Sequence, residues 1–188
     1  MVKLFSERSN ERRKHMEIFI PDIYQKSIYT IDYQKLQSRG IKCLLFDLDN
    51  TLVPASIKVP NKKIRELFTE LKEKGFTVIL FSNSPKKRLK PFKEELEVDA
   101  LASAMKPLSR NYLKIMREYK FTVSEVAMIG DQLLTDILGG NRVGITTILI
   151  NPVSKQDMVF TKINRRLEDF ILKRLRDKDL FTKGKYYD

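Results

Sequence analysis

Short apolar runs alternate with longer amphipathic stretches through the middle of this 188-residue chain. The apolar runs have the length and composition of buried strands, whereas the stretches between them repeat apolar residues at helical spacing. This alternation is typical of a parallel sheet whose strands are joined by crossover helices. The predicted strands span 41–46, 76–81, a weak 98–103, 126–130 and 145–150.

Four helices are predicted between these strands. The first covers 61–75, because Asn61 stands where it can cap the start and Gly75 where it can end the helix. The others are predicted at 85–96, at 109–119 and from Leu133 to the Gly139-Gly140 pair. The fold class is therefore α/β, a Rossmann-like three-layer sandwich with a central parallel sheet.

Two flanks enclose the predicted core of 41–152 within a single predicted domain of 1–188. Residues 1–40 are rich in tyrosine and isoleucine towards their end and should form a helical or irregular cover. Residues 153–188 are predicted to form a basic helical tail, which either packs on the sheet or lies on anionic lipid. The apolar residues expected along one side of this helix are Phe160, Ile163, Leu167, Phe170, Ile171 and Leu175.

The composition excludes several classes of protein. A chain of this length can bury a sizeable core without disulfides, and the single cysteine, Cys43, lies inside an apolar run. That placement suits a small buried side chain in a reducing compartment. No secretory leader is visible, and no apolar stretch reaches the ~20 residues of a membrane-spanning helix. We therefore expect a cytoplasmic protein, with a peripheral position on the inner face of the membrane as an option.

The net charge of +12 points to anionic partners, namely nucleic acid, lipid headgroups or phosphorylated metabolites. Between Lys58 and Lys93, eleven residues are Lys or Arg. The only histidine, His15, stands in a charged segment, which argues against a histidine-based zinc site and against a Ser-His-Asp triad. Metal chemistry in this chain would have to use oxygen ligands.

Polar side chains follow the predicted strands at the points where the strands end. In an open parallel sheet, ligands bind beyond these ends. Each signal alone is weak, since a DxD pair is more often a turn or a helix cap and Ser-Asn is ordinary in turns. The signals in chain order are Asp47, Asp49 and Thr51 after the first strand, Ser82 and Asn83 after the second, Lys106 after the third, and Asp131 and Asp136 after the fourth.

This ordered set resembles the four motifs of the haloacid dehalogenase (HAD) superfamily of aspartate-nucleophile phosphotransferases. The motifs read DLDNTL (47–52), FSNS (81–84), MKP (105–107) and GDQLLTD (130–136), within a region of resemblance that covers 41–150. The segment that precedes and includes the first motif is similar to the bacterial YqeG-type phosphatases, a IIIA-type group related to mitochondrial phosphatidylglycerophosphate phosphatases. The resemblance implies a HAD-like fold, phosphatase activity and Mg²⁺ as cofactor.

The resemblance also implies catalytic roles for three aspartates. Asp47 would attack the phosphoryl group, form an aspartyl-phosphate and bind Mg²⁺. Asp49 would protonate the leaving group, activate water and bind the metal through its backbone carbonyl. Asp131 would complete the metal ligands. An acid two residues after the nucleophile marks the phosphatases of the family, so Asp49 favours phosphoester hydrolysis.

Five further residues receive supporting roles from the resemblance. Ser82 and Lys106 would hold the transferring phosphoryl group and balance its charge. Thr51 and Asn83 are assigned to phosphate binding and to orienting the nucleophile loop. Asp136 would support the loop or a metal-bound water.

The spacing between motifs limits the substrate. Only 30 residues lie between Thr51 and Ser82, and 23 between Ser82 and Lys106, so no sizeable cap domain fits. An uncapped site admits large substrates. The basic stretch PKKRLKPFK (85–93) and the basic tail could dock on acidic lipid, although a solvated helix face explains such charges equally well.

These observations rank three functions. The leading one is hydrolysis of phosphatidylglycerophosphate at the membrane surface, a step of phosphatidylglycerol synthesis. The alternative is a phosphatase for soluble nucleotides, sugar phosphates or polynucleotide ends, and the third is a non-catalytic RNA- or protein-binding module. Nucleic acid is the weaker partner, because Phe92 is the one aromatic residue in the basic stretch 85–93. The sequence predicts no oligomeric state.

Overall fold

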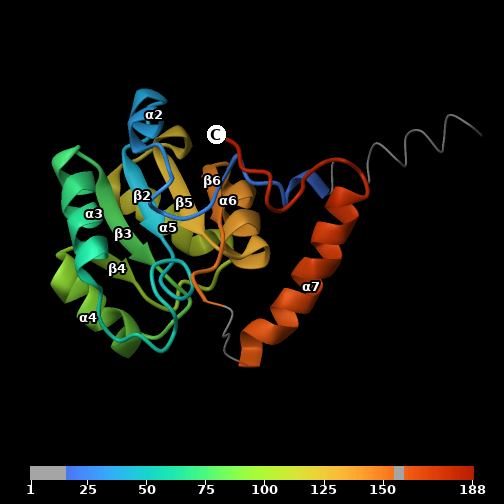
Figure 1. The fold of residues 1–188 in the computed structure, drawn as a ribbon. Coiled ribbons are helices and arrows are strands. Elements are labelled where there is room, and N and C mark those ends of the chain that lie inside the picture. Colours follow the sequence, from blue (N-terminus) through green and yellow to red (C-terminus); the bar gives the residue numbers. More distant parts are fainter. Residues whose placement is uncertain (1–15, 155–158) are drawn as a thin grey trace, which may run out of the picture.

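The sheet has six strands, all parallel, in the order β1-β6-β5-β2-β3-β4 (Figure 1). The computed structural model describes residues 16–154 and 159–188, and at 159–165 the backbone alone. The predicted α/β fold with a central parallel sheet is confirmed. The strands are β1 (Ile23–Gln25), β2 (Cys43–Phe46), β3 (Thr77–Phe81), β4 (Asp99–Leu101), β5 (Val126–Gly130) and β6 (Thr146–Ile150).

Helices connect the strands in the expected order. The first crossover helix begins as predicted, because the Asn61 side chain accepts a hydrogen bond from the amide of Ile64 at 2.9 Å. A 3-10 turn, Val123–Glu125, precedes β5, and a π-helical turn, Leu133–Ile137, follows it. The α-helices are α2 (Tyr33–Ser38), α3 (Lys62–Glu73), α4 (Lys86–Leu96), α5 (Ser109–Tyr119), α6 (Leu138–Val143) and α7 (Val159–Arg176).

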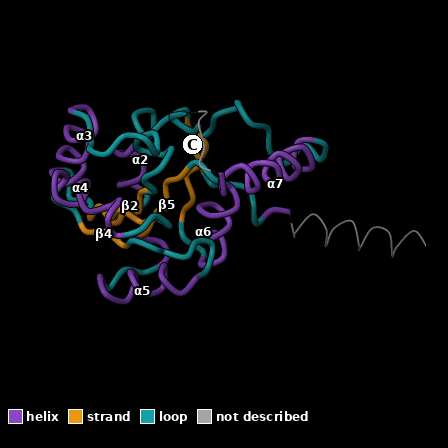
Figure 2. Tube along the Cα trace, turned by 90° about the horizontal axis from the view of Figure 1, so that it is seen from below, coloured by secondary structure: helices purple, strands orange, loops and turns teal. Residues whose placement is uncertain are grey.

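Strand β2 is central and covered on both faces. Its side chains alternate between two hydrophobic clusters. Leu44 and Phe46 pack with α3 and α4, whereas Cys43 and Leu45 pack with α5. Figure 2 shows α3 and α4 on one side of the strands and α5 on the other. The three layers leave the carboxyl ends of the strands, which we call the carboxyl edge, as the place where side chains meet a ligand.

The predicted end of the fourth helix at the glycine pair is wrong. Helix α6 continues through Gly139 and Gly140 to Val143. A Cβ atom on Gly139 would lie 2.5 Å from the hydroxyl of Tyr112, and one on Gly140 would lie 2.4 Å from a methyl group of Thr147. The two glycines therefore permit close packing of α6 between α5 and the sheet, and do not stop the helix.

The N-terminal cover contains a strand that the sequence analysis did not predict. Strand β1 pairs in parallel with β6 and forms one edge of the sheet. On its outer side, Tyr24 and Tyr187 form an antiparallel bridge, with both N–H···O distances at 2.9 Å. The described part of the predicted cover thus adds a sixth strand and the short helix α2.

Helix α7 packs on the sheet through a different side from the predicted one. Ile171 and Leu175 are buried with residues of β1 and β6, and Glu168 is buried on the same side. Leu167 and Phe170 are 51% and 54% exposed, so the prediction that they share the packed side is wrong. The spacing 168, 171, 175 selects a packed stripe that leaves 167 and 170 facing outwards.

Some predictions fall outside the described residues. They concern His15 and the side chains of Phe160 and Ile163. Among the residues that the structure describes, no helix has the length and apolar content needed to cross a membrane.

Candidate active site

Three buried carboxylates converge on the carboxyl edge. Asp47 directly follows β2, Asp131 directly follows β5, and Asp136 lies in the π-helical turn. One carboxylate oxygen from each lies within 4.8 Å of the other two, and no member of this acidic triad is more than 6% exposed. Carboxylates this close repel one another, so the arrangement favours bound positive charge.

Lys106 supplies positive charge inside the protein. Its ammonium donates to Asp47 Oδ1 at 2.7 Å and to Asp136 Oδ1 at 2.6 Å, and its side chain is 2% exposed. The amide side chain of Asn83 holds the lysine backbone, accepting from Lys106 N at 2.8 Å and donating to Lys106 O at 3.1 Å. The second motif therefore positions the third.

Burial and the neighbouring charges both shift the pKa values of Asp47 and Lys106. The net pKa of Asp47 is raised to about 6, because burial and the nearby Asp136 and Asp49 raise it by more than Lys106 lowers it. Burial alone would lower the pKa of Lys106, but Asp136 and Asp47 reverse this, and the net pKa is raised. The raised pKa of Lys106 keeps its ammonium charged at neutral pH, next to the carboxylate of Asp47.

Local geometry explains why a glycine precedes Asp131. A Cβ atom on Gly130 would lie 2.2 Å from the carboxyl carbon of Asp136, so only glycine leaves space for that carboxylate over the strand end. The amide of Gln132 donates to Asp136 Oδ2 at 3.1 Å. Two residues later, the amide of Leu134 donates to Glu168 on α7 at 3.0 Å. The π-helical turn is thus held from both sides.

The side chain of Asp49 is not part of the triad. Its carboxylate is held by Arg88 and Ser84, and we call these three side chains the polar clasp. Arg88 donates to Asp49 Oδ1 through Nε at 3.0 Å and through Nη2 at 2.7 Å, and Ser84 donates to Oδ2 at 2.5 Å. Arg88 also donates to the backbone oxygen of Ile57. The side chains of Asp49 and Arg88 are each 16% exposed, so the clasp reaches solvent.

Sequence reasoning missed Ser84 and Arg88 as site residues. Ser84 stands at the end of the second motif, and Arg88 lies in the basic stretch that was assigned to a surface. A usable signal was present, since Arg88 is in the first turn of α4, shortly after the second motif.

Thr51 and Ser82, which were also predicted, form hydrogen bonds with other residues of the site. Thr51 is fully buried and donates to Asp131 Oδ1 at 3.1 Å. Ser82 is 2% exposed, and its hydroxyl accepts from the amide of Ser84 at 3.3 Å. Contacts of Thr51, Ser82 and Asn83 with a phosphate stay a prediction.

The acidic triad fits a divalent cation. Its donors are carboxylate oxygens, which hard divalent cations prefer. Asp136, predicted only as a supporting residue, lies with Asp47 and Asp131, whereas the side chain of Asp49 faces Arg88. A metal contact through the carbonyl of Asp49 stays a prediction.

The chain is similar in sequence to proteins that are already known. A family model described as a haloacid dehalogenase-like hydrolase matches residues 55–144. The chain is 39% identical over 162 residues to a Bacillus subtilis (strain 168) protein described as a probable phosphatase, YqeG, with 86% of this chain and 94% of that protein covered. The chain belongs to the haloacid dehalogenase-like hydrolase family. The predicted family and enzyme class, a HAD phosphatase, are confirmed.

Two further proteins are similar to this chain. The chain is 30% identical over 183 residues to phosphatidylglycerophosphate phosphatase 1, chloroplastic/mitochondrial, of Arabidopsis thaliana; 89% of this chain is covered, and it spans about half (51%) of that relative. Its fold is similar to the cobalt-bound deoxy-D-mannose-octulosonate 8-phosphate phosphatase of Haemophilus influenzae, with a TM-score of 0.50 and 17% identity. That match covers 81% of this chain and 98% of the other, and supports the fold alone. HAD hydrolases use a divalent metal in general, which agrees with the triad.

Proposed function

We propose that this HAD phosphatase is a Mg²⁺-dependent phosphomonoesterase that forms an aspartyl-phosphate on Asp47. The observation that supports this most strongly is the buried ion pair of Lys106 with Asp47 and Asp136, set beside Asp131. A phosphate monoester is a dianion, so a carboxylate can attack it only where positive charge offsets the repulsion. Mg²⁺ held by Asp47 and Asp131, with Asp136 beside them, would supply such charge.

The first half-reaction transfers the phosphoryl group to the protein. An Asp47 carboxylate oxygen attacks phosphorus, and the bond from phosphorus to the ester oxygen breaks. Asp49 gives a proton to the departing oxygen, so that an alcohol leaves. Lys106 stabilises the negative charge on the transferring group.

The second half-reaction restores Asp47. The carboxylate of Asp49 accepts a proton from water, and the resulting hydroxide attacks phosphorus of the aspartyl-phosphate. The acyl-phosphate bond breaks at phosphorus, which frees the Asp47 carboxylate and inorganic phosphate. Arg88 and Ser84 act as positioning residues, because they hold both oxygens of Asp49 at the solvent side of the triad.

For the substrate we propose phosphatidylglycerophosphate, at the surface of an anionic membrane on its cytoplasmic side. Between β2 and β4, all of which the structure describes, the chain contains α3, β3 and α4 and no inserted domain. The site is therefore open to a substrate with bulky substituents. The named activity of the plant relative and the net charge of +12 support the same choice. Soluble nucleotides, sugar phosphates and polynucleotide ends form the competing substrate class.

A phosphate-release assay with Mg²⁺ tests the proposal. Wild type is compared with Asp47→Asn on phosphatidylglycerophosphate, nucleotides and sugar phosphates, and Asp169→Asn, an exposed acid on α7, serves as the matched control. We expect hydrolysis of the lipid by wild type and the control, and none above background by Asp47→Asn. Full activity of Asp47→Asn would contradict the mechanism, and turnover of soluble monoesters without the lipid would contradict the substrate.

A further inference from the structure

Five exposed apolar side chains lie in the loops that follow β2, β4 and β6 at the carboxyl edge, and we call them the apolar rim. Each is between 43% and 58% exposed. Large apolar side chains that are exposed in neighbouring loops of one edge, and not scattered singly, mark a contact surface. The rim consists of Ile57, Val59, Met105, Leu108 and Val153.

Hydrogen bonds fix the rim to the site. The backbone oxygen of Ile57 accepts from Arg88, which also clasps Asp49. The amide of Val153 donates at 2.8 Å to the carbonyl of Asn50, three residues after Asp47. Met105 and Leu108 flank Lys106, and a backbone hydrogen bond of 2.9 Å joins them. The rim therefore lies on the same edge as the catalytic carboxylates.

The helices that begin at this edge carry the wrong charge for their own stability. The positive end of a helix dipole favours acids in the first turn, yet α3, α4 and α5 have none there. Exposed basic residues occupy these turns and the loop before α3. We call them the basic collar: Lys58, Lys62, Lys63, Lys86, Lys87 and Arg110.

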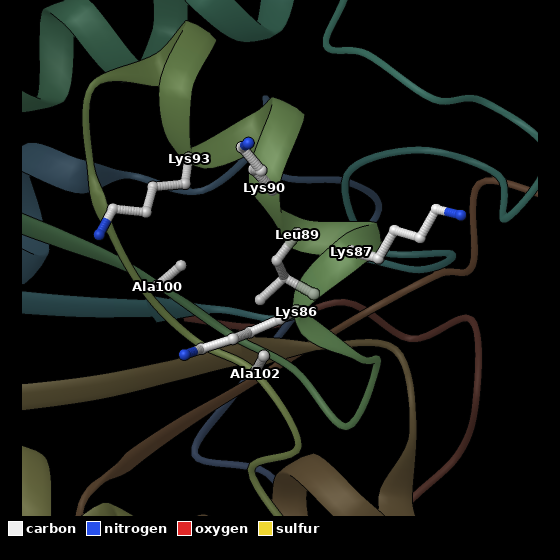
Figure 3. A pocket seen from close by; sticks show the side chains of 7 residues that line it. All are labelled: Lys86, Lys87, Leu89, Lys90, Lys93, Ala100 and Ala102. Atoms are coloured by element: carbon white, nitrogen blue, oxygen red, sulfur yellow. The ribbon is translucent and has the colours of Figure 1, made fainter.

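A hollow beside the collar also combines apolar surface with surrounding lysines. Its floor is apolar, made by Leu89, Ala100 and Ala102, and its volume is about 270 Å³. Figure 3 shows Lys86 and Lys93 extending around this floor from α4. Apolar surface bordered by ammonium groups thus occurs along α4 and β4 as well as at the rim.

We propose that the protein docks edge-down on an anionic lipid bilayer, with the apolar rim inserted between lipids and the basic collar on the headgroup phosphates. This inference rests on the proposed function and adds the surface and the orientation. A soluble anion would need the collar but not the exposed rim. A single-stranded nucleic acid would need several aromatic stacking surfaces, whereas none of the five rim residues is aromatic and one exposed tyrosine, Tyr29, contacts the collar through Lys63. In this orientation the opening beside Asp47 faces the headgroup layer, where the scissile monoester lies.

Co-sedimentation of the full chain with vesicles tests the docking surface. Vesicles of phosphatidylglycerol with phosphatidylcholine are compared with phosphatidylcholine alone. We expect the rim variant Val59→Ser/Leu108→Ser to bind at least about tenfold more weakly, because each side chain leaves apolar surroundings. We expect the collar variant Lys58→Gln/Lys87→Gln to bind about 25-fold more weakly, at about fivefold for each charge.

Two variants at other places sharpen the assay. Val123→Ser changes an equally exposed valine before β5, at the opposite edge, and should bind like wild type. Leu167→Ser/Phe170→Ser removes the exposed apolar side of α7 and should also retain binding. Loss of binding in the α7 variant with full binding in the rim variant would overturn the proposal. Tighter binding of wild type to single-stranded RNA than to anionic vesicles would also overturn it.

Fluorescence gives a direct measurement of insertion. The chain contains no tryptophan, so Val59→Trp and Val123→Trp each carry a single tryptophan, which is excited selectively at wavelengths where the seven tyrosines do not absorb. On anionic vesicles, emission of Val59→Trp should shift to the blue while Val123→Trp stays unchanged. No shift at position 59 under conditions where the protein sediments with vesicles would overturn the orientation.

Activity separates a failure of docking from a failure of the proposed function. The rim variant should hydrolyse p-nitrophenyl phosphate, a soluble monoester, as fast as wild type and lose activity only on vesicle-borne lipid. Wild type that binds vesicles through the rim but releases no phosphate from the lipid would contradict the substrate and support the docking surface. Equal activity of rim variant and wild type on vesicles would overturn the docking surface and leave the substrate in place.

Discussion

Charges are placed differently at the two ends of the strands. We compare the carboxyl edge with the opposite ends of the strands, which we call the amino edge. At the amino edge, Glu125 accepts from Lys42 at 2.6 Å and from the amide of Thr122 at 2.8 Å, so an acid caps the start of a turn and pairs with a base. At the carboxyl edge, helices begin with lysines, and carboxylates are buried beside one another.

This difference shows which edge is shaped by function. Local stability favours caps, compensated charges and acids at helix starts, and the amino edge satisfies these preferences. Departures from such rules are expected at functional sites. The carboxyl edge departs from them twice, once in its buried triad and once in its basic collar.

The largest effect should come from Lys106→Met. Removing the ammonium leaves Asp47 and Asp136 buried without this partner, so we expect a loss of about 3–5 kcal/mol in unfolding free energy. We also expect at least about a hundredfold loss of kcat. Urea unfolding without metal and phosphate release measure the two effects. Lys42→Met, at the exposed pair of the amino edge, should change both only slightly, and an equal loss in the two variants would contradict the comparison.

A smaller effect is expected from Arg88→Gln. Asp49 would keep Ser84 and lose two donors, so its carboxylate would be less well placed for proton transfer, and kcat on a soluble monoester should fall about 10- to 100-fold. Because the change acts through Asp49, the pH profile of kcat should also change, which a purely structural effect would not cause. Lys90→Gln on the same helix should leave kcat and the profile unaltered, and so serves as control.

Charge reversal at one collar position should separate stability from function. Lys87→Glu places an acid in the first turn of α4, so the protein should gain about 0.3–1 kcal/mol in thermal or urea unfolding. Vesicle binding by the same variant should weaken. Lys93→Glu reverses a charge in the last turn of α4, where the dipole favours a base, and should destabilise the protein. A loss of stability in Lys87→Glu would remove the argument that the collar is kept for binding.

The smallest effect concerns acid stability at the amino edge. Hydrogen bonding to Lys42 lowers the pKa of Glu125 from 4.5 to about 2, with further hydrogen bonds from Thr122. A lowered pKa stabilises the folded state above pH 4.5, and this contribution is lost as the pH falls from 4.5 to 2. Glu125→Gln should therefore flatten the pH dependence of unfolding in that window. An unchanged slope would show that the pair contributes nothing.

The central fold could be predicted because its signals are local and strong. The run 41–46 and the helical repeat at 61–75 each read correctly as β2 and α3, since their apolar residues follow one period. Strand β1 was not predicted, because three residues of mixed polarity carry no periodic signal. Its pairing with β6 makes it a strand. The sides of α7 were misassigned because a basic helix with apolar residues on two faces has more than one possible packed stripe.

The site residues also fall into those that the sequence could place and those that it could not. Residues that directly follow strands, such as Asp47 and Asp131, could be placed from topology alone. Arg88 and Ser84 could not, because their roles depend on how side chains reach Asp49 from the next loop and helix. Asp136 was underrated for a related reason, since a π-helical turn brings it into the triad and sequence spacing does not predict such turns.

Strand β1 also sets an order of events during synthesis on the ribosome. Tyr24 emerges early, but its neighbours in the sheet, Leu149 of β6 and Tyr187, are translated much later. The nascent chain can therefore assemble β2, β3 and β5 while β1 waits for a partner, and loop closure over so many residues is slow. A stalled chain whose exposed part ends after α6 should leave β1 accessible to protease or chaperone, with the central sheet already protected.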